Sequence, residues 1–197
     1  MSTTAVKGSR RQHILECFAH MLERDPGQKI TTAKLAREVG VSEAALYRHF
    51  PSKTKMLESF IEFVEEAIFS RISVILEEPQ STADHCSQLI LLVLTFSEKN
   101  PGISRLLTGE PLTGESTRLR NRINQFFERL ETQLRQILRE SEIRGERPPK
   151  LDPNNSALLM LNLLEGRLGR FVRSDFQKYP THGWTEHWQL IRVSVFG

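Results

Sequence analysis

The amino-acid sequence predicts an all-α protein in which a small three-helix head of the helix-turn-helix type precedes a larger bundle of helices. Apolar residues recur at intervals of three and four along most of the chain, which is the periodicity of one face of an α-helix. Breaks that contain proline or glycine separate these stretches, and no stretch alternates as a half-buried strand does. We therefore expect helices joined by loops, without a β-sheet.

The first predicted helix covers residues 10–23, where five apolar residues share one face: Ile14, Leu15, Phe18, Ala19 and Leu22. Residues 1–8 are small and polar, so we expect a loose tail there. The basic residues Lys7, Arg10 and Arg11 either contact phosphates beside the head or are merely solvated.

Residues 29–55 predict two short helices joined by a tight turn. Thr31 and Thr32 offer hydroxyls that cap the first helix, and Gly40 ends it. Ser42 can cap the second helix, and Pro51 forces a break before the next one. This succession is the pattern of a helix-turn-helix motif.

The second of these helices suits the major groove of DNA, because small side chains at its start let the backbone approach base edges. Hydroxyl, imidazole and amino groups at the helix ends can position phosphates. An ordinary helical hairpin with solvated charges is the alternative interpretation. The candidate DNA-binding residues are Thr31, Thr32, Lys34, Ser42, Glu43, Ala44, Ala45, Tyr47, Arg48, His49 and Lys53.

This stretch closely resembles the DNA-binding head of the TetR family of regulators. In that family a threonine opens the second helix, and a Tyr-x-His-Phe run followed by a Ser-Lys pair ends the third. The corresponding residues here are Thr31, Tyr47, His49, Phe50, Ser52 and Lys53. The resemblance implies a TetR-like fold, with a head over residues 1–52 and a regulatory and dimerisation domain over residues 53–197.

The predicted body begins with one long helix over residues 52–77 that carries apolar residues on two faces, which implies two packing partners. The next helix is apolar all round from Leu89 to Leu94, as in the buried centre of a bundle. A short helix at 103–107 and a loop at 109–117 follow. A long amphipathic helix is predicted over residues 118–144, with seven residues facing inward: Leu119, Ile123, Phe126, Leu130, Leu134, Ile137 and Leu138.

Two more helices complete the prediction. Asp152 and Pro153 suit the start of a helix that runs to about Phe176. Gly166 and Gly169 weaken this helix by about 1 kcal/mol each relative to alanine, and close approach of another helix in a dimer seam would compensate. In the last helix Trp184 and Trp188 are expected to be core residues.

The charge is unevenly distributed, although the whole chain of 197 residues carries only +3. Residues 1–55 hold ten Lys and Arg against five Asp and Glu, and the remainder holds 17 against 19. A basic head favours a nucleic-acid partner. No apolar run is long enough for a membrane span and no signal peptide is visible, so a cytoplasmic protein is expected.

No catalytic, metal or cofactor site is predicted. Cys17 and Cys86 are far apart and lie beside apolar positions, which indicates reduced core thiols rather than a disulfide. His85 next to Cys86 lacks a second pair of ligands that would complete a zinc shell. No phosphate loop, metal helix or nucleophile elbow occurs, so we expect no enzyme and no cofactor.

The body also resembles one branch of the TetR family, the nucleoid occlusion factors. Blocks such as FIEFVEE, KNPGISRLLTG and GRFVRSDF carry this likeness. It implies a homodimer on palindromic chromosomal sites that, when bound to DNA, antagonises assembly of the division protein FtsZ. More than one dimer could load on each site.

The resemblance also implies a groove for the acidic and apolar C-terminal tail of FtsZ. An apolar slot with cations and an amide at its rim suits such a peptide. The corresponding residues are Phe63, Arg71, Leu92, Thr95, Lys99 and Asn100. Two alternatives stay open at this point: a ligand-responsive repressor of the same family, and a DNA-binding protein whose body has an unrelated role.

Overall fold

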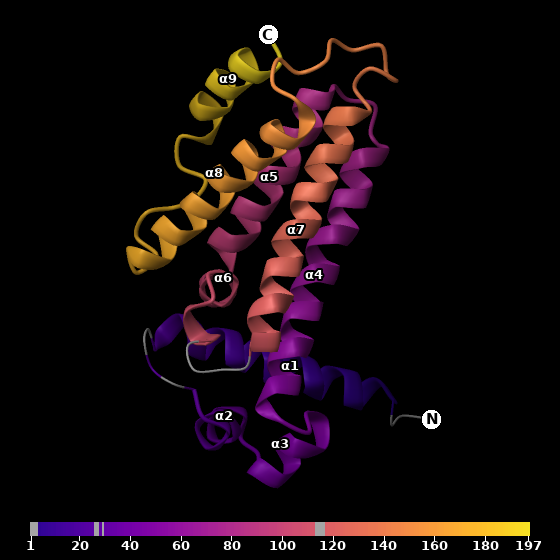
Figure 1. Ribbon diagram of the computed structural model, residues 1–197. Coiled ribbons are helices and arrows are strands. Elements are labelled where there is room, and N and C mark those ends of the chain that lie inside the picture. The colour runs from indigo at the N-terminus through magenta and orange to yellow at the C-terminus, as the bar shows by residue number, and fades with distance from the viewer. Residues whose placement is uncertain (1–3, 26–27, 29, 113–116) are drawn as a thin grey trace. The chain divides into compact units, whose positions relative to one another are not determined.

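The computed structural model describes residues 4–25, 28, 30–112 and 117–197, and every regular element in them is a helix (Figure 1). The all-α prediction is therefore confirmed. In chain order the elements are α1 (Thr4–Arg24), α2 (Thr32–Val39), α3 (Glu43–His49), α4 (Lys53–Glu77), α5 (Thr82–Lys99), α6 (Pro101–Leu107), the 3₁₀ helix η1 (Glu110–Leu112), α7 (Thr117–Arg139), α8 (Pro153–Arg173) and α9 (Trp184–Val195).

The chain forms two compact units. Unit one contains residues 1–64 and 100–123, and unit two contains residues 65–99 and 124–197. The long helices α4 and α7 each continue from one unit into the other. The boundary predicted between residues 52 and 53 separates a DNA-binding head from a regulatory domain by function, not by compactness, and it stays a prediction.

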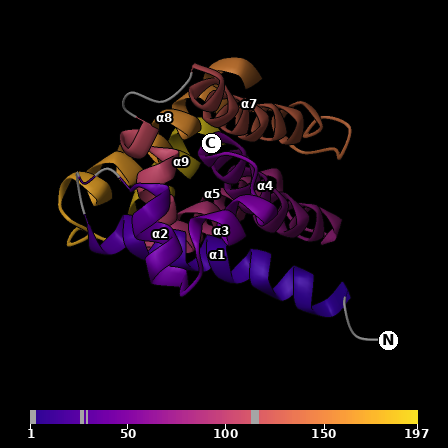
Figure 2. The same cartoon turned by 90° about the horizontal axis from the view of Figure 1, so that it is seen from below.

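In unit one, α1 packs against both α2 and α6, and α2 packs against α3 (Figure 2). Its core includes the T-shaped pair of Phe18 and Phe60, whose ring centroids are 5.7 Å apart. The prediction of a loose tail over residues 1–8 is wrong for residues 4–8, because α1 already begins at Thr4. No proline interrupts this segment, so the helix can extend beyond the apolar stripe that the sequence shows.

The contact between α1 and α6 depends on a glycine and a buried arginine. A Cβ atom at Gly102 would lie 2.0 Å from the carbonyl oxygen of Ala19, so only glycine allows this approach. Arg105 is buried and donates hydrogen bonds to the carbonyl oxygens of Leu22 and Asp25 at the end of α1. Its guanidinium also pairs with Glu110 through bonds of 2.5 and 3.1 Å.

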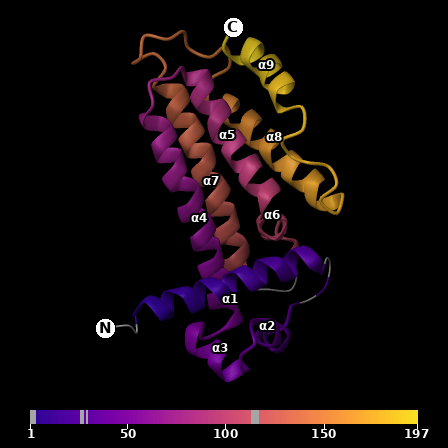
Figure 3. The ribbon, with the colours of Figure 1, turned by 180° about the vertical axis from the view of Figure 1, so that it is seen from behind.

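Unit two is a bundle of helices in which α5 packs against α8 and α9. The seven residues predicted to face inward along α7 are all buried, five of them in unit two and two, Leu119 and Ile123, in unit one. Trp184 and Trp188 of α9 are buried too, and their ring centroids are 5.5 Å apart in a stacked arrangement. Side by side with α7, the second half of α4 contributes Phe69, whose ring contacts Phe126 and lies under the guanidinium of Arg129 (Figure 3).

Three predictions for this bundle are corrected. The exposed fraction of Leu91 is 36%, so α5 is not buried all round. Helix α7 ends at Arg139 instead of residue 144, because the chain turns through Gly145 in the left-handed conformation and brings Glu146 to the start of α5. At the start of α5, both carboxylate oxygens of Glu146 accept the backbone N–H of Thr82, at 2.9 and 3.1 Å. Helix α8 ends at Arg173, short of Phe176, which has a positive φ.

Cys86 is fully buried, and burial raises the pKa of its thiol, which makes it an inert core group. Cys17 is only half-buried, so the expectation of a core thiol does not hold for it. His85 is buried too, where its ring contacts the carbonyl oxygen of Glu78 and the guanidinium of Arg144. Within the described ranges, no helix is long and apolar enough to span a bilayer.

We expect Gly102→Ala to destabilise unit one, because the added methyl group collides with the rigid backbone of α1. The cost should reach the upper part of the about 1–3 kcal/mol that overpacking typically costs. Thermal unfolding followed by circular dichroism measures the effect. An unchanged melting temperature would show that α6 does not approach α1 this closely.

Candidate nucleic-acid interface

The turn between α2 and α3 has the geometry that its sequence predicts. Thr31 caps α2, because its hydroxyl accepts the backbone N–H of Lys34 at 3.2 Å. Gly40 ends the helix with φ +73°, a conformation that favours glycine, and the N–H of Val41 returns to the carbonyl of Ala36 at 2.9 Å. These caps fix the path by which the chain enters α3.

Helix α3 is held by its buried residues and presents its short side chains outward. Ser42 caps it by accepting the backbone N–H of Ala45 at 3.2 Å. Leu46 and Phe50 are buried and attach the helix to the core of unit one, whereas Ala44 is exposed and Ala45 is half-buried. The start of α3 therefore offers little side-chain bulk to a surface that approaches it.

A small hydrogen-bond cluster joins α2 to α3. The hydroxyl of Thr32 donates to a carboxylate oxygen of Glu43 at 2.8 Å and accepts from the hydroxyl of Tyr47 at 3.3 Å. The cluster holds the acidic group of Glu43 against α2 and orients the side chain of Tyr47, a residue that is 42% exposed. The sequence marked all three residues as separate DNA contacts, and their mutual bonds were not predicted.

Helix α1 supports the motif through two arginines. The guanidinium of Arg24 binds both carboxylate oxygens of Glu38 on α2, at 3.1 and 3.2 Å. This hydrogen bonding lowers the pKa of Glu38 and raises that of Arg24. Arg11 donates to Ser59 at 2.6 Å and lies 5.1 Å from the centre of the Phe50 ring. In this structure Arg11 thus holds helices together, and a contact between Arg11 and a phosphate stays a prediction.

The remaining candidates lie around the same two helices. Lys34 is exposed and its amino group contacts the side chain of Gln28 at 3.0 Å. Arg48 is exposed, and His49 and Lys53 are half-buried at the end of α3 and the start of α4. All eleven candidate residues lie in the segment from Thr31 to Lys53, which belongs to unit one.

The candidate groove residues are divided between the two units. Phe63 and Asn100 belong to unit one, where both line one small pocket. The other four belong to unit two: Arg71 on α4, and Leu92, Thr95 and Lys99 on α5. The three α5 residues are spaced by three and four, so they share one face of that helix. Leu92 and Thr95 are half-buried, and Lys99 is exposed.

Unit two also has a hollow of about 780 Å³ between α8, α9 and their connecting loop. Arg167 crosses it, donating to the carbonyl oxygens of Pro180 and His182 at 2.7 and 3.1 Å, with its guanidinium near the Trp184 ring. Further basic groups around this hollow are Arg170, Lys178, His182 and His187. In the part of the chain that the structure describes, no cluster of three or more potential metal ligands occurs.

The comparisons with known proteins agree with this architecture. Residues 21–60 match the family described as bacterial regulatory proteins, tetR family, and residues 80–195 match an SlmA-like family described as tetracyclin repressor-like, C-terminal domain. The nucleoid occlusion factor SlmA from Shewanella pealeana is 55% identical over 96% of each chain. The SlmA protein of Shewanella denitrificans is 54% identical over 98% of each chain.

The chain belongs to the TetR family, in its SlmA branch. A TetR-family protein of this branch is a DNA-binding nucleoid occlusion protein, so the helix-turn-helix described above is its DNA-binding motif. Solved structures of TetR-type regulators share the fold. The regulator FadR from Bacillus halodurans has a TM-score of 0.79 at 17% identity, covering 92% of this chain and 94% of its own. A TetR regulator from Haloarcula marismortui has a TM-score of 0.79 at 17% identity, covering 95% of this chain and 99% of its own.

Sequence reasoning did not find Arg24, Glu38 and Arg105 as supports of the motif. The pairing of Arg24 with Glu38 joins residues 14 positions apart, and Arg105 reaches across 80 or more positions to α1. Helical periodicity reports neighbours within a helix, and it carries no signal for such contacts. For Arg105 the sequence offered only its place in the short predicted helix at 103–107, which does not indicate burial.

We expect Thr32→Val to weaken specific DNA binding about tenfold, because it removes both hydrogen bonds that fix Glu43 and Tyr47. Two such bonds contribute about 1–2 kcal/mol together at an exposed site, and 1.4 kcal/mol is a factor of ten. Thr32→Ser retains the hydroxyl and should bind like the wild type. Anisotropy titrations with labelled operator and with random duplex measure the two affinities. Equal operator binding by the valine and serine variants would contradict this role.

Proposed function

We propose that this protein is a DNA-bound inhibitor of cell division: a dimer on palindromic chromosomal sites that prevents FtsZ assembly over the nucleoid. The observation that carries the proposal is the match, over 96% of the chain, to relatives named nucleoid occlusion factor. A complete helix-turn-helix and a body with an exposed, mixed apolar and cationic helix face support it. Coupling of division to chromosome position follows if the inhibitor acts only where DNA is present.

Dimerisation is supported by an exposed apolar face on α8 and α9. Leu158 and Leu159 of α8 are each 45% exposed, and Leu190 and Val193 of α9 are 70% and 63% exposed. Gly166 is exposed on α8, and beyond its own stretch of helix no described atom lies within 4 Å of the position that a Cβ would take. A second copy seated on this face would bury these leucines and use the glycine for close approach. Two copies of α3 would then read the two halves of a palindrome.

Leu158→Asp combined with Leu190→Asp should convert the dimer to monomers, because a charge on each helix opposes burial of the face. Sedimentation velocity at micromolar concentration measures the change, and specific DNA binding should fall with it. Ile143→Asp is the matched control, since Ile143 is 85% exposed and lies on a turn outside α8 and α9. A double variant that sediments as the wild type does would place the dimer interface elsewhere.

The partner surface is proposed on α4 and α5. In unit two, Leu92 and Thr95 provide partly apolar area, with the exposed cation Lys99 on the same face of α5. Arg71 is exposed on α4, and its guanidinium donates a hydrogen bond of 2.7 Å to the carbonyl oxygen of Ala67 in the same helix. Apolar area beside cations suits a peptide that carries both apolar and acidic residues. The C-terminal tail of FtsZ is the proposed occupant.

A fluorescently labelled FtsZ C-terminal peptide titrated with the protein and operator DNA should give saturable binding. Lys99→Asp should weaken the peptide complex about tenfold or more, because it removes an attraction and adds a repulsion. Lys178→Asp carries the same charge change in unit two, outside α4 and α5, and should leave peptide binding unchanged. Operator binding by all three proteins controls for folding.

Absence of peptide binding by the wild type, with and without operator DNA, would overturn the division-inhibitor proposal. The hollow beside Arg167 would then favour the second candidate function, a ligand-responsive repressor. In that case a small molecule that binds unit two should release the operator DNA.

A further inference from the structure

The hollow between α8, α9 and their connecting loop lies entirely within unit two and is large enough for a small molecule. Its volume of about 780 Å³ falls within the roughly 300–1,000 Å³ that is usual for ligand sites. Among the residues described around it, positive charge comes from Arg167, Arg170 and Lys178, and Glu186 supplies one carboxylate. The charge of the lining therefore favours an anionic ligand.

The wall that the connecting loop contributes is fixed from two sides. On one side, Arg167 donates hydrogen bonds to the carbonyl oxygens of Pro180 and His182. On the other side, the hydroxyl of Thr181 donates to the carboxylate of Glu98 on α5. The hollow is therefore formed before any ligand arrives, which lowers the entropic cost of binding.

Two arginines of α8 line the hollow close together. Arg170 lies three residues after Arg167, so both side chains project from one side of the helix. Burial lowers the pKa of Arg167, and the positive charge of Arg170 lowers it further. Within the described chain, the guanidinium of Arg170 has neither a hydrogen-bond partner nor an ion-pair partner. An anion bound between the two guanidinium groups would offset their repulsion.

The start of α9 adds hydrogen-bond donors to the same hollow. Gly183 is the N-cap of α9 and has no side chain that could cap it, so the positive end of the helix dipole borders the hollow. The guanidinium of Arg167 donates to Nδ1 of His187. The neutral His187 ring therefore carries its proton on Nε2, which can donate to a ligand. Both features suit phosphate oxygens.

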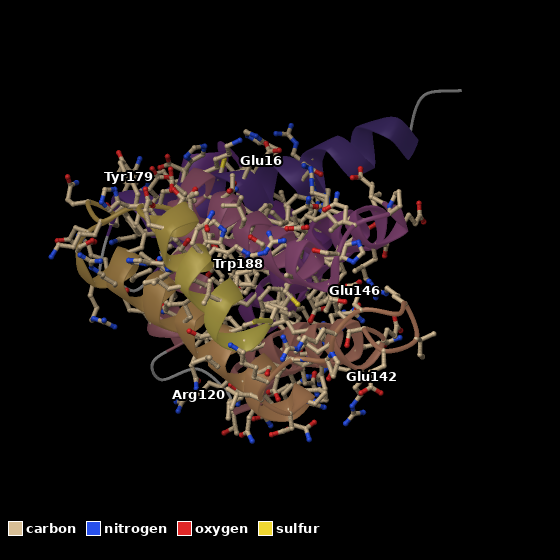
Figure 4. The ribbon with its side chains drawn as sticks, turned by 90° about the horizontal axis from the view of Figure 1, so that it is seen from above. Glu16, Arg120, Glu142, Glu146, Tyr179 and Trp188 are labelled. Carbon is tan, nitrogen blue, oxygen red and sulfur yellow. The ribbon has the colours of Figure 1, made fainter. Side chains whose placement is uncertain are left out.

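Tyr179 gives the hollow an aromatic surface. Its ring centroid lies 6.4 Å from that of Phe171, which is buried, while Tyr179 itself is 60% exposed. Figure 4 shows Tyr179 on the loop that joins α8 to α9. An aromatic ring that is supported from within and open to solvent suits stacking with a flat heterocycle.

We infer that the hollow binds a nucleotide, with its phosphates at Arg170 and the start of α9 and its base stacked on Tyr179. A guanidinium binds two phosphate oxygens through parallel N–H groups. A nucleotide joins a polyanion to a flat ring, and the lining offers a partner for each. The inference is independent of the proposed function, because these residues belong neither to the helix-turn-helix nor to the surface proposed on α4 and α5.

The nucleotide site lies toward the other end of the α8–α9 pair from the leucines proposed for dimerisation, although Gly166 borders both. Leu159 lies near the start of α8 and Arg170 in its last turn, about 17 Å along the axis at 1.5 Å per residue. Helix α9 runs back beside α8, since Lys150, just before α8, donates to the carbonyl oxygen of Val193 near the end of α9. The nucleotide should therefore bind to the dimer.

The test is calorimetric titration of the full-length protein with ATP, adenosine and inorganic triphosphate. Operator DNA at saturating concentration occupies the helix-turn-helix, so that its basic residues do not bind the probes. ATP should bind saturably, whereas adenosine, which lacks phosphates, should give no detectable binding. Triphosphate should bind about fivefold more weakly than ATP, because it has no base to stack on an aromatic ring.

Arg170→Gln tests the phosphate contact, and Arg173→Gln is its matched control. Arg173 is exposed on α8 outside the lining of the hollow, so both variants remove one charge from the last turn of the same helix. ATP affinity should fall about tenfold for Arg170→Gln, which loses a charge-assisted contact, and stay unchanged for Arg173→Gln. Tyr179→Leu should weaken ATP binding about fivefold and leave triphosphate binding unchanged. Thermal unfolding of each variant controls for folding.

Two results would overturn the inference. Absence of ATP binding by the wild type, or equal loss of affinity in the two glutamine variants, would show that the hollow is not a phosphate site. Equal affinity for ATP and triphosphate, with no effect of Tyr179→Leu, would show that the base makes no contact and that the ligand is not a nucleotide.

Discussion

The structure of unit one depends on the burial of Arg105. A guanidinium is costly to remove from water unless each of its N–H groups finds a partner. Here it meets carbonyl groups at the end of α1, where the helix dipole is negative, and the carboxylate of Glu110. The arginine therefore fixes α6 and η1 to the end of α1 just before the chain enters the DNA-binding motif. Gly102 allows this contact, because it removes the side chain that would separate the two helices.

The DNA-binding motif is consequently more than a pair of helices with suitable side chains. Its α2 is tied to α1 by Arg24 and Glu38, and its α3 is tied to α2 by Thr32, Glu43 and Tyr47. These contacts reduce the freedom of exposed side chains before DNA arrives, which lowers the entropic cost of binding. Preorganisation of this kind suits the proposed dimer, whose two heads would fit two half-sites at a fixed spacing.

Helix α1 has two roles in this arrangement. Its buried face completes the core of unit one, and its exposed face reaches both the end of α3 and the apolar pocket beside Phe63. In unit two, the carboxylate of Glu146 caps the start of α5, and two tryptophans stack within α9.

The sequence by itself determined the helices, their caps and the inward faces, because these depend on spacings of three and four and on single residues such as Thr31, Gly40 and Asp152. It also identified the helix-turn-helix from one contiguous segment. Only the tertiary structure decided which helices meet, that α1 begins at Thr4, that Leu91 is exposed, and that Arg105 is buried. These features depend on contacts between residues far apart in the chain, and the periodicity of one segment contains no information about the position of another.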